Sequence, residues 1–396
     1  MTKLEAYRDV APRGTVDIIL RLAERVQGRR FLHVSGGRFG SGPAEILHTL
    51  VPIMADLGIE ASWEITGGDP PFYATARALH SALTGEERVL TGEGLDHYLE
   101  MNRINAKKLA LDADLVLVHD VQPATLVQHR SGGRWVWRCH FDASRAQRRA
   151  WSFLRPYLGQ YDAAIFSMPR FARRMSVPQY IIHPSIDPLS AKNRELPARE
   201  IATLLGSLRV PQDRPLLLQV GPFTRGADPL GVVNAYRLVK KYHPVRLVLA
   251  GTAADDRESR EVLAELREAA RDDDDLTVLE LPPDAHLQIN ALQRAATIVL
   301  QKSVREGFGL GAAEAMWKGK PVIAGLAGGL AQQVLYDVTG YTVQSVEGAA
   351  FRIRHLLNNP ELIARMGAAG REHVRRSFLI TRHLTDYLAL LIHLTQ

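Results

Sequence analysis

The sequence contains a single cysteine, Cys139, among 396 residues. One cysteine excludes an internal disulfide framework and is typical of a reducing compartment, so we expect the protein in the cytoplasm. No apolar run approaches the ~20 residues that a membrane-spanning helix needs. The first 20 residues also lack the basic head, apolar centre and small-residue cleavage site of a signal peptide. We therefore expect neither a membrane span nor secretion.

Several chemical motifs are missing as well. The sequence has no His or Cys cluster with metal-ligand spacing, no P-loop and no G-x-S-x-G elbow. The four aspartates at 272–275 follow a charged helical stretch and precede a strand, so we interpret them as a solvated loop and predict no structural metal. The net charge of +6 is modest and scattered. It is compatible with a phosphate-bearing small ligand and gives no specific indication of nucleic acid.

What the sequence does contain is a regular alternation of short β-rich runs with longer helical patterns. Alternation of this kind indicates parallel sheets covered on both faces, and the length fits two domains. Helices are expected at 43–57, 72–84 and 145–159. The expected strands are 30–36, 60–66, 114–120, 135–142, 163–168, 179–185, 215–221, 245–251, 276–281, 297–301 and 321–325.

A polar, proline-bearing stretch at 183–200 interrupts this alternation and is typical of a linker. We therefore predict an α/β protein with two doubly wound, Rossmann-like domains that face each other across a cleft. The N-terminal domain should comprise residues 1–190 and the C-terminal domain residues 196–377. The helix expected over 378–396 repeats apolar residues at helical spacing and should pack back onto the N-terminal domain.

The stretch "SVREGFGLGAAEAMWKGKPVIAG" (303–325) carries two glutamates, Glu306 and Glu314, around a glycine-rich turn that opens a helix. Glycines allow close approach of the backbone to a ligand, and the free N–H groups at a helix start favour an anion such as a diphosphate. Carboxylates are poor partners for phosphate but good acceptors for hydroxyls. Taken singly, each glutamate fits an ordinary surface position; together they predict hydroxyl clamps at the two ends of a nucleotide sugar.

The spacing E-x7-E with G-F-G inside, followed by "EAMWKGKPVIA", resembles the retaining glycosyltransferases of family 4, which have the GT-B fold. The similarity runs nearly end to end and is greatest to the branch of trehalose synthases, which transfer glucose from a nucleotide donor to free glucose. Further segments that carry it are "FGSGPAEILHTLVPIMADLGIEASW", "LVLVHDVQPATL", "WRCHFD", "PSIDPLSAKN" and "NALQRA".

The resemblance implies roles for individual residues on the donor side. Glu306 would bond hydroxyls of the transferred sugar, and Glu314 would hold the nucleotide ribose. A glycine loop from the N-terminal domain would close over the donor phosphates; this sequence has Ser41 and Pro43 where the trehalose synthases have Gly and Val. The phosphate-side positions implied in this way are Gly40, Ser41, Gly42, Gly307, Phe308, Gly309 and Leu310.

Other positions are implied for the reacting sugar and the acceptor. His140, at the end of a strand, would lie beside the reacting sugar and join Glu306 as a catalytic candidate, although a histidine satisfied at a strand end is the alternative. Asp120 and Gln122 are candidates for the acceptor glucose, because glucose is bound through its hydroxyls. Arg138 and Asp142 are further acceptor candidates that could instead pair with each other.

One loop departs from the family pattern. Where family members carry an Arg and a Lys that neutralise the donor diphosphate, this chain has Pro222 and Ala227. Electrostatic stabilisation of this kind is commonly worth ~3 kcal/mol per group, so losing both without replacement should severely reduce turnover. Arg225, in the same loop, and Lys302, before Glu306, are the candidate replacements.

These observations lead to one expected function and two alternatives. The expected function is retaining transfer of glucose from ADP-, UDP- or GDP-glucose to glucose, giving α,α-trehalose without any cofactor. The first alternative is a retaining trehalose phosphorylase or a transferase with another activated donor. The second is a catalytically impaired sugar- or nucleotide-binding protein. The oligomeric state stays open, with a homodimer among the alternatives.

Overall fold

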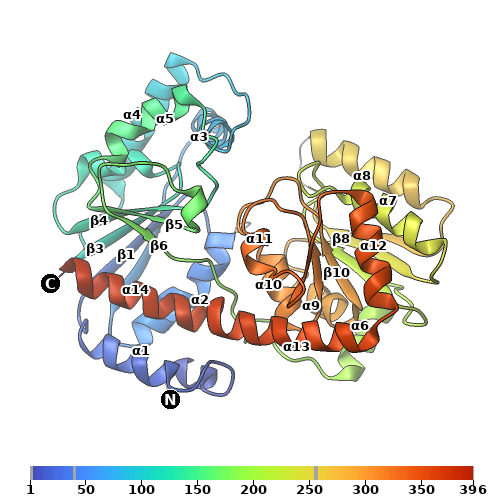
Figure 1. Cartoon of the computed structure of the whole chain (residues 1–396). Coiled ribbons are helices and arrows are strands. Elements are labelled where there is room, and N and C mark those ends of the chain that lie inside the picture. The colour runs from blue at the N-terminus through green and yellow to red at the C-terminus, as the bar shows by residue number, and fades with distance from the viewer. Residues whose placement is uncertain (1–2, 39–41, 254–256, 396) are drawn as a thin grey trace. The chain divides into compact units, whose positions relative to one another are not determined.

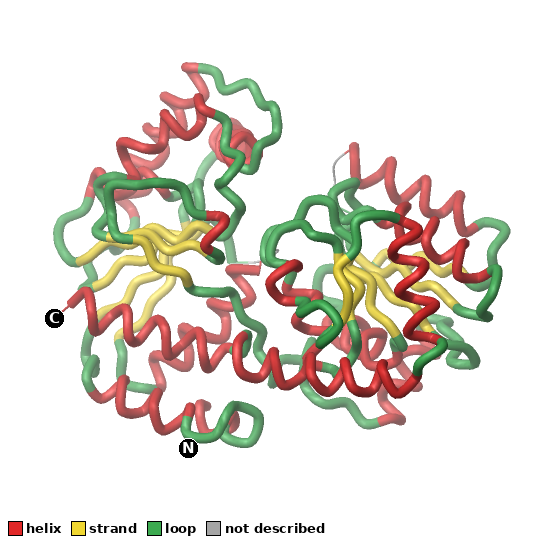
Figure 2. The backbone as a smooth tube through the Cα atoms, in the orientation of Figure 1, coloured by secondary structure: helices red, strands yellow, loops and turns green. Residues whose placement is uncertain are grey.

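A computed structural model describes residues 3–38, 42–253 and 257–395 of the chain. It divides into two compact units, one formed by Met1–Ser185 with Ile380–Gln396 and the other by Ile186–Leu379. The sequence places the corresponding boundaries at 190 and 377. Figures 1 and 2 show that each unit has a sheet at its centre and helices around it.

The first unit is built on a six-stranded parallel sheet with the order β2-β1-β3-β4-β5-β6. Its strands are β1 (Arg30–Ser35), β2 (Glu60–Ile65), β3 (Leu115–His119), β4 (Arg134–Cys139), β5 (Ala163–Phe166) and β6 (Gln179–Ile181). All five residues of β3 are buried. A strand buried on both faces needs a continuous apolar run, which is the pattern that the sequence shows here.

Helices cover both faces of this sheet (Figure 1). On one face α14 contacts both α1 and α2, and α3, α4 and α5 lie on the other face. The last helix, α14, also contacts β3. The helices of this unit are α1 (Thr15–Glu24), α2 (Gly42–Asp56), α3 (Pro70–Leu83), α4 (Gly92–Lys108), α5 (Arg148–Leu158) and α14 (Ile380–Thr395), with short 3-10 helices at Lys3–Tyr7, Ala124–His129 and Pro169–Phe171.

The second unit repeats this plan with the strand order β12-β11-β10-β7-β8-β9, again all parallel. Its strands are β7 (Leu216–Val220), β8 (Arg246–Gly251), β9 (Leu276–Glu280), β10 (Ile298–Gln301), β11 (Val322–Ala324) and β12 (Gly340–Thr342). Its helices are α6 (Ala198–Ser207), α7 (Pro229–Lys240), α8 (Arg257–Ala270), α9 (His286–Ala295), α10 (Leu310–Trp317), α11 (Leu330–Gln333), α12 (Val346–Leu357) and α13 (Pro360–Ser377).

The predicted fold class, α/β with two doubly wound parallel sheets, is confirmed. All eleven strands expected from the sequence are present. The sequence analysis named neither β12, which has only three residues, nor the helices α1 and α4, and it gave no separate bounds for most helices of the second unit. Strands β4 and β6 end earlier than expected, because His140 and His183 already belong to the loops at the carboxyl edge of the sheet.

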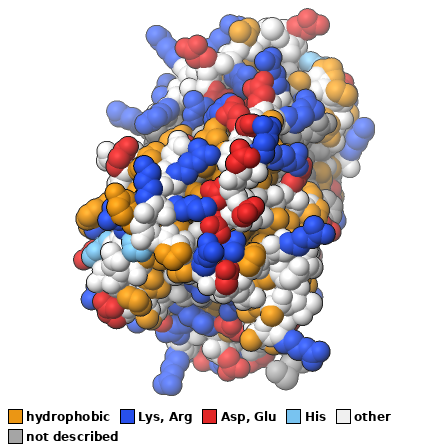
Figure 3. Space-filling view, turned by 90° about the vertical axis from the view of Figure 1, so that its right-hand side faces the viewer, with side chains coloured by type: hydrophobic (Ala, Val, Ile, Leu, Met, Phe, Trp, Pro, Cys, Tyr) orange, Lys and Arg blue, Asp and Glu red, His pale blue; other side chains and the backbone are white. Residues whose placement is uncertain are grey.

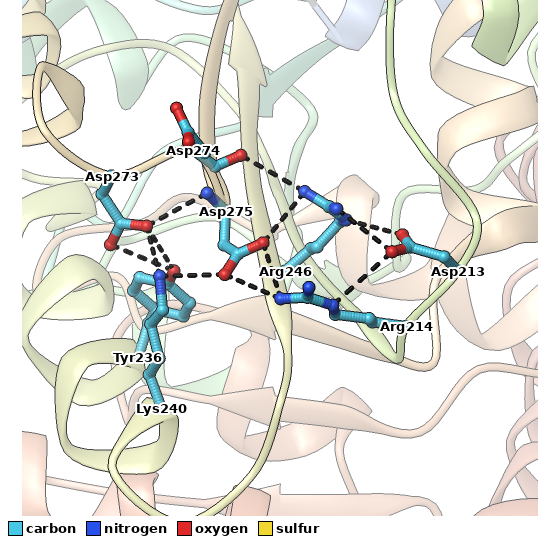
Figure 4. Close-up of polar contacts among 8 residues, drawn as sticks. All are labelled: Asp213, Arg214, Tyr236, Lys240, Arg246, Asp273, Asp274 and Asp275. Atoms are coloured by element: carbon cyan, nitrogen blue, oxygen red, sulfur yellow. Dashed lines mark hydrogen bonds and ion pairs between the residues drawn. The ribbon is translucent and has the colours of Figure 1, made fainter.

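The interpretation of the four aspartates as a solvated loop is only partly right. Asp273 and Asp275 form an ion-pair network with basic residues of the neighbouring elements, shown in Figure 4. The Asp275 carboxylate lies 2.9 Å from Arg214, 3.0 Å from Arg246 and 3.0 Å from Lys240. The cluster therefore ties α7 to the starts of β8 and β9. Among the described residues, no group of three or more His, Cys, Asp or Glu side chains could hold a metal ion.

Charges of both signs are mixed on the face of the molecule that Figure 3 shows. On the face shown in Figure 3, Lys and Arg side chains are interspersed with Asp and Glu side chains rather than gathered into one field. None of the helices in the described part of the chain is long and apolar enough to cross a bilayer.

The Asp275 network makes a testable prediction for stability. Its side chain is only 13 % exposed, so Asp275→Ala removes the carboxylate that three cations share and leaves them only Asp213 and Asp273 as acidic partners. We expect a loss of about 1 to 3 kcal/mol in the free energy of unfolding of the second unit, measured by urea titration. The exposed neighbour Asp272 is the control, and Asp272→Ala should change stability by less than about 0.5 kcal/mol. Equal effects of the two substitutions would contradict a structural role for the network.

Candidate functional site

The strand order of each sheet reverses between two neighbouring strands. In the first unit these strands are β1 and β3, and in the second they are β7 and β10. The connections that leave such a pair diverge to opposite faces, so a crevice forms beyond their carboxyl ends, which is where open α/β sheets bind ligands. The candidate residues from the sequence lie in the loops that follow these four strands or the strands beside them.

In the second unit the glycine-rich turn connects β10 to α10. Gly309 immediately precedes the helix with a φ of 85°, a left-handed conformation that favours glycine. A Cβ atom at Gly311 would lie 3.8 Å from the carbonyl oxygen of Val220, the last residue of β7. The start of α10 therefore sits directly against the end of β7, at the reversal point. A Cβ atom at Gly307 would meet nothing within 4 Å, so this part of the turn is open.

A second glycine segment, 325–329, supports this turn from behind, and the sequence analysis missed it. A Cβ atom at Gly328 would lie only 2.1 Å from the Gly307 carbonyl oxygen, and the Gly329 N–H donates to that same oxygen at 2.7 Å. The side-chain amide of Gln333 donates to the carbonyl of Phe308. The turn is thus held by direct backbone-to-backbone contact, which only glycines permit. The sequence signal was "AGLAGG" (324–329), a glycine-rich run that begins at the last residue of β11.

Glu306 is the first acidic residue of the turn, and its side chain is half-buried. Its carboxylate accepts hydrogen bonds from Ser303 at 3.1 Å, from Gln301 at 3.2 Å and from the backbone N–H of Gly307 at 3.1 Å. Burial raises its pKa, while these hydrogen bonds act in the opposite direction. The side chain is therefore fixed at the mouth of the turn by its own loop.

Glu314, on α10, is buried, with only 3 % of its side chain exposed. Its carboxylate pairs with Lys192 at 3.0 Å, a residue of the segment that leads into α6. One helical turn later, Lys318 donates to Asn193 at 2.8 Å, and burial lowers the pKa of Lys318 to about 7. The segment 192–193 therefore lies over the flank of α10. The sequence analysis singled out "PSIDPLSAKN" as a motif but did not connect Lys192 with Glu314.

The two candidate replacement cations have different surroundings. Arg225 is 51 % exposed and pairs with Glu265 of α8, with Nη1 and Oε2 at 2.7 Å. Lys302 is buried, and its ammonium pairs with Asp228. Asp228 directly follows Ala227 and caps α7 by accepting from the Gly231 N–H at 3.2 Å. Lys302 therefore reaches from β10 to the end of the loop that lacks the family's cations.

Pro222 and Ala227, which stand where family members carry the Arg and the Lys, differ in their exposure to solvent. Pro222 is exposed. Ala227 is 6 % exposed, and its carbonyl accepts a hydrogen bond from the buried Gln219 at 2.8 Å. The backbone at 227 is thus part of the folded loop, and a long side chain there would start from a buried Cα.

In the first unit a cavity of about 660 Å³ opens beyond β1 and β3. Asp120 and Gln122, both candidates from the sequence, line it together with Ser35, Gly36, Gly37, Tyr73, Arg77, His80 and His119. Asp120 has a φ of 60°, unusual for a residue other than glycine, and burial raises its pKa. Tyr73, Arg77 and His80 lie on one face of α3 at helical spacing, a signal that the sequence analysis did not use.

The other candidates that the sequence places in this unit have the following surroundings. His140 follows β4, and its backbone N–H donates to Asp120 at 2.9 Å. Arg138 is fully buried, donates to the Ile182 carbonyl at 2.6 Å and is not among the residues that line the cavity, so its acceptor role stays a prediction. It does not pair with Asp142, whose carboxylate instead accepts from the Ser144 N–H. Gly42 begins α2, while Gly40 and Ser41 lie outside the described residues.

The two glycine segments allow a matched test of loop support. Gly328 has a φ of 52°, and a methyl group there would overlap two backbone oxygens, so Gly328→Ala should destabilise the second unit by about 2 to 4 kcal/mol. Its melting temperature should fall by about 5 °C or more in a thermal unfolding scan. Gly307→Ala adds the same methyl group where nothing lies within 4 Å and should leave the melting temperature within about 2 °C. Equal melting temperatures for the two variants would contradict the tight backbone contact.

Two family models match this chain. The model described as trehalose synthase, N-terminal domain, matches residues 33–173, and the model of glycosyl transferases group 1 matches residues 201–373. The trehalose synthase of Pyrococcus horikoshii is 40% identical over 400 residues, which cover 98% of this chain and 96% of the relative. The trehalose phosphorylase of Pleurotus pulmonarius is 24% identical over 94% of this chain, but the alignment spans only 58% of that longer protein.

Solved structures agree at the level of the fold. The sucrose-phosphate synthase from Thermosynechococcus elongatus matches with a TM-score of 0.71 at 19% identity, covering 91% of this chain and 98% of that one. Two six-stranded parallel sheets of this order, each flanked by helices, are the GT-B arrangement that the resemblance implied. The chain belongs to the trehalose synthase family of the group 1 glycosyltransferases and is a hexosyltransferase with the GT-B fold.

Proposed function

We propose that the protein transfers glucose, with retention of configuration, from a nucleotide sugar to free glucose and so forms α,α-trehalose. The observation that carries the proposal is the placement of the Glu306 carboxylate beside an open glycine turn at the β7–β10 reversal point. A carboxylate accepts hydroxyls, and the turn with the start of α10 accommodates phosphate. Membership of the trehalose synthase family supports the same assignment.

The donor is assigned to the second unit. Its diphosphate would bind against residues 307–310, where the N-terminal end of α10 carries a partial positive charge. Glu306 would bind hydroxyls of the transferred glucose. Glu314 would hold the ribose, sharing its carboxylate with Lys192, which already neutralises it at 3.0 Å. We propose ADP-, UDP- or GDP-glucose as the donor and no further cofactor.

The reaction exchanges one bond at the anomeric carbon. The bond from this carbon to the diphosphate oxygen breaks, a bond to the acceptor hydroxyl oxygen forms on the same face, and the hydroxyl proton leaves with the diphosphate. Glu306 is suited to orienting the sugar and stabilising its positive charge, because three donors from the end of β10 and its own loop fix the carboxylate. Those bonds also make it a weaker nucleophile, which favours this role over covalent attack.

The acceptor is assigned to the cavity of the first unit. Glucose is neutral and rich in hydroxyls, so it needs both donors and acceptors around it. Asp120 supplies a carboxylate, Gln122 an amide, and Tyr73, Arg77 and His80 supply further polar groups from α3. His140, tied to Asp120 through its backbone, would bind the reacting sugar.

Lys302 is the residue that we propose in place of the missing cations. It is buried at the reversal point, and its partner Asp228 lies next to Ala227, so the charge stands close to where the family's lysine would begin. Arg225 is exposed and is engaged by Glu265 on another helix.

A trehalose phosphorylase activity is the second candidate, favoured by one observation. With Pro222 and Ala227 in the phosphate loop, the site carries less positive charge than a diphosphate usually meets, which would suit the single phosphate of glucose 1-phosphate. Relatives named trehalose phosphorylase, 24% identical or less, are consistent with it.

The direct test is product formation from labelled glucose. We expect labelled α,α-trehalose with at least one of ADP-, UDP- and GDP-glucose, and none with glucose 1-phosphate. Glu306→Gln, prepared in parallel, should reduce the rate by about 100-fold or more and so exclude a contaminating enzyme. Phosphate-dependent consumption of trehalose would favour the phosphorylase instead. Calorimetric binding of a nucleotide sugar without turnover would identify a binding protein.

The choice between the two cations is tested by matched substitutions. Lys302→Met removes the proposed charge at the leaving group and should lower kcat by about 10²- to 10³-fold. Arg225→Met removes an equal charge from an exposed pair and should change kcat by less than about threefold. Steady-state kinetics with the best donor measures both. The reverse order of effects would assign the compensation to Arg225.

A further inference from the structure

Three histidines of the first unit form a line across three neighbouring strands. His33 lies on β1 and pairs in register with Leu117 of β3, two residues before His119. His119 in turn pairs with Arg138 of β4, two residues before His140. Residues two apart in a strand share a face. Each histidine is therefore one step nearer to the carboxyl edge of the sheet than the last, and the line leads from the core to the edge.

The three rings are joined by hydrogen bonds. His33 Nδ1 lies 3.1 Å from His119 Nε2, and His119 Nδ1 lies 2.9 Å from His140 Nε2. His33 is fully buried and His119 is 2 % exposed, while His140 is half-buried. At the inner end, His33 Nε2 has no hydrogen-bond partner among the described residues. Phe31 stacks on His33 at 4.5 Å, and Tyr387 of α14 lies 5.8 Å away, between ring centroids.

All three imidazoles are neutral at ordinary pH. Burial lowers the pKa of His33 to about 3 and depresses those of His119 and His140. The buried Arg138 guanidinium adds to the effect at His119 and His140. A neutral imidazole has one N–H and one lone pair, so each ring in the line donates once and accepts once.

A line of such rings has only two arrangements of its protons. In the first, every ring carries its proton on Nδ1: His33 donates to His119, His119 donates to His140, and His140 presents Nδ1–H outward. In the second, every ring carries its proton on Nε2, and the donation runs inward from His140 to His33. This second arrangement leaves the His33 Nε2–H buried against aromatic rings without an acceptor.

The surroundings of His33 Nε2, at the inner end of the line, favour one of the two arrangements. Buried N–H groups without a partner are rarer in proteins than buried acceptors without one. The first arrangement leaves only a bare lone pair at His33 Nε2, so it is the favoured one. The absence of an acceptor at His33 Nε2 therefore places a proton on His140 Nδ1, the ring nitrogen that does not contact His119.

We propose that His119 is a positioning residue that fixes His140 as its Nδ1–H tautomer, so that His140 donates a hydrogen bond to an oxygen of the bound sugar. His33 completes the line by satisfying His119 Nε2. The identity of the ligand as a sugar rests on the proposed function, whereas the tautomer of His140 does not. When His140 Nδ1–H donates to a sugar hydroxyl oxygen, the proton of that hydroxyl must point toward a different acceptor. The hydroxyl is then held in a single orientation.

The tautomer can be read without any activity assay. Histidine labelled with 15N in the full-length protein gives long-range 1H–15N spectra in which the two tautomers differ, and the His140→Gln spectrum assigns the His140 signals. We expect the wild-type protein at pH 7.5 to show Nδ1–H at His140. An Nε2–H tautomer in the wild-type protein would overturn the proposal outright.

Two matched substitutions separate positioning from packing. His119→Phe removes the donor to His140 and should shift His140 toward the Nε2–H tautomer. His33→Phe removes an equally buried ring, but His119 can still donate to His140, so the tautomer should persist. An unchanged His140 spectrum in His119→Phe, or the same shift in both variants, would overturn the assignment to His119. Should His119→Phe fail to fold, His119→Leu provides the same test, and wild-type spectra still decide the tautomer.

Kinetics supply a second, independent reading. If the sugar binds only the protein whose His140 carries its proton on Nδ1, the apparent affinity falls with the fraction of molecules in that form. KM of His119→Phe should then equal the wild-type KM divided by the Nδ1–H fraction measured in that variant, and kcat should change less. His33→Phe should keep KM within about twofold. A chain that forms no trehalose would refute the proposed function and leave the spectroscopic result intact. A KM that does not follow the measured fraction would overturn the link between the tautomer and sugar binding.

Discussion

Both candidate sites depend on the reversal of strand order within a parallel sheet. Helical crossovers leave β1 and β3 for opposite faces, as they leave β7 and β10, so no connection covers the carboxyl ends of either pair. The space beyond these strand ends is therefore bordered by loops and not by helices or strands. The glycine turn, the β7–α7 loop and the polar cavity of the first unit all lie at these two places. The chemistry of the chain is thus positioned by topology before any single side chain is considered.

Three cations near the proposed donor site are each already paired with a carboxylate. Lys302 is paired with Asp228, Arg225 with Glu265 and Lys192 with Glu314. A buried charge without a partner costs several kcal/mol, so a chain that must fold before it binds its ligand has to supply internal partners. An incoming diphosphate would therefore share these cations with the protein's own acids. On the proposed function, the phosphate loop would in this way lie near positive charge without the family's Arg and Lys.

The sequence predicted the fold class and the strands well, because buried parallel strands leave continuous apolar runs. It also singled out Glu306 and Glu314, since a glycine turn between a strand and a helix is a local pattern. It could not predict Gly328 behind Gly307, or Lys192 beside Glu314, because these contacts join segments far apart in the chain. Nor could the sequence predict the surroundings of Arg138, because the contact that buries it, with the Ile182 carbonyl, also joins distant segments.

The line of histidines escaped the sequence analysis for a similar reason. His33 and His119 sit inside apolar strand runs, where a lone histidine is an ordinary core residue. Their relation depends on the order β1-β3-β4, which brings together strands separated by more than 80 residues for the first step and about 20 for the second. Neither periodicity nor motif spacing carries that information.

The placement of α14 has a consequence for how the protein matures. This helix contacts α1, α2 and β3 of the first unit, and its Tyr387 packs beside His33, yet the whole second unit precedes it in the chain. During synthesis on the ribosome, the part of the first sheet's face that α14 covers stays uncovered until nearly two hundred residues of the second unit have been made. The first unit is therefore completed last, and its apolar face is the surface that a nascent chain would have to shield in the interval.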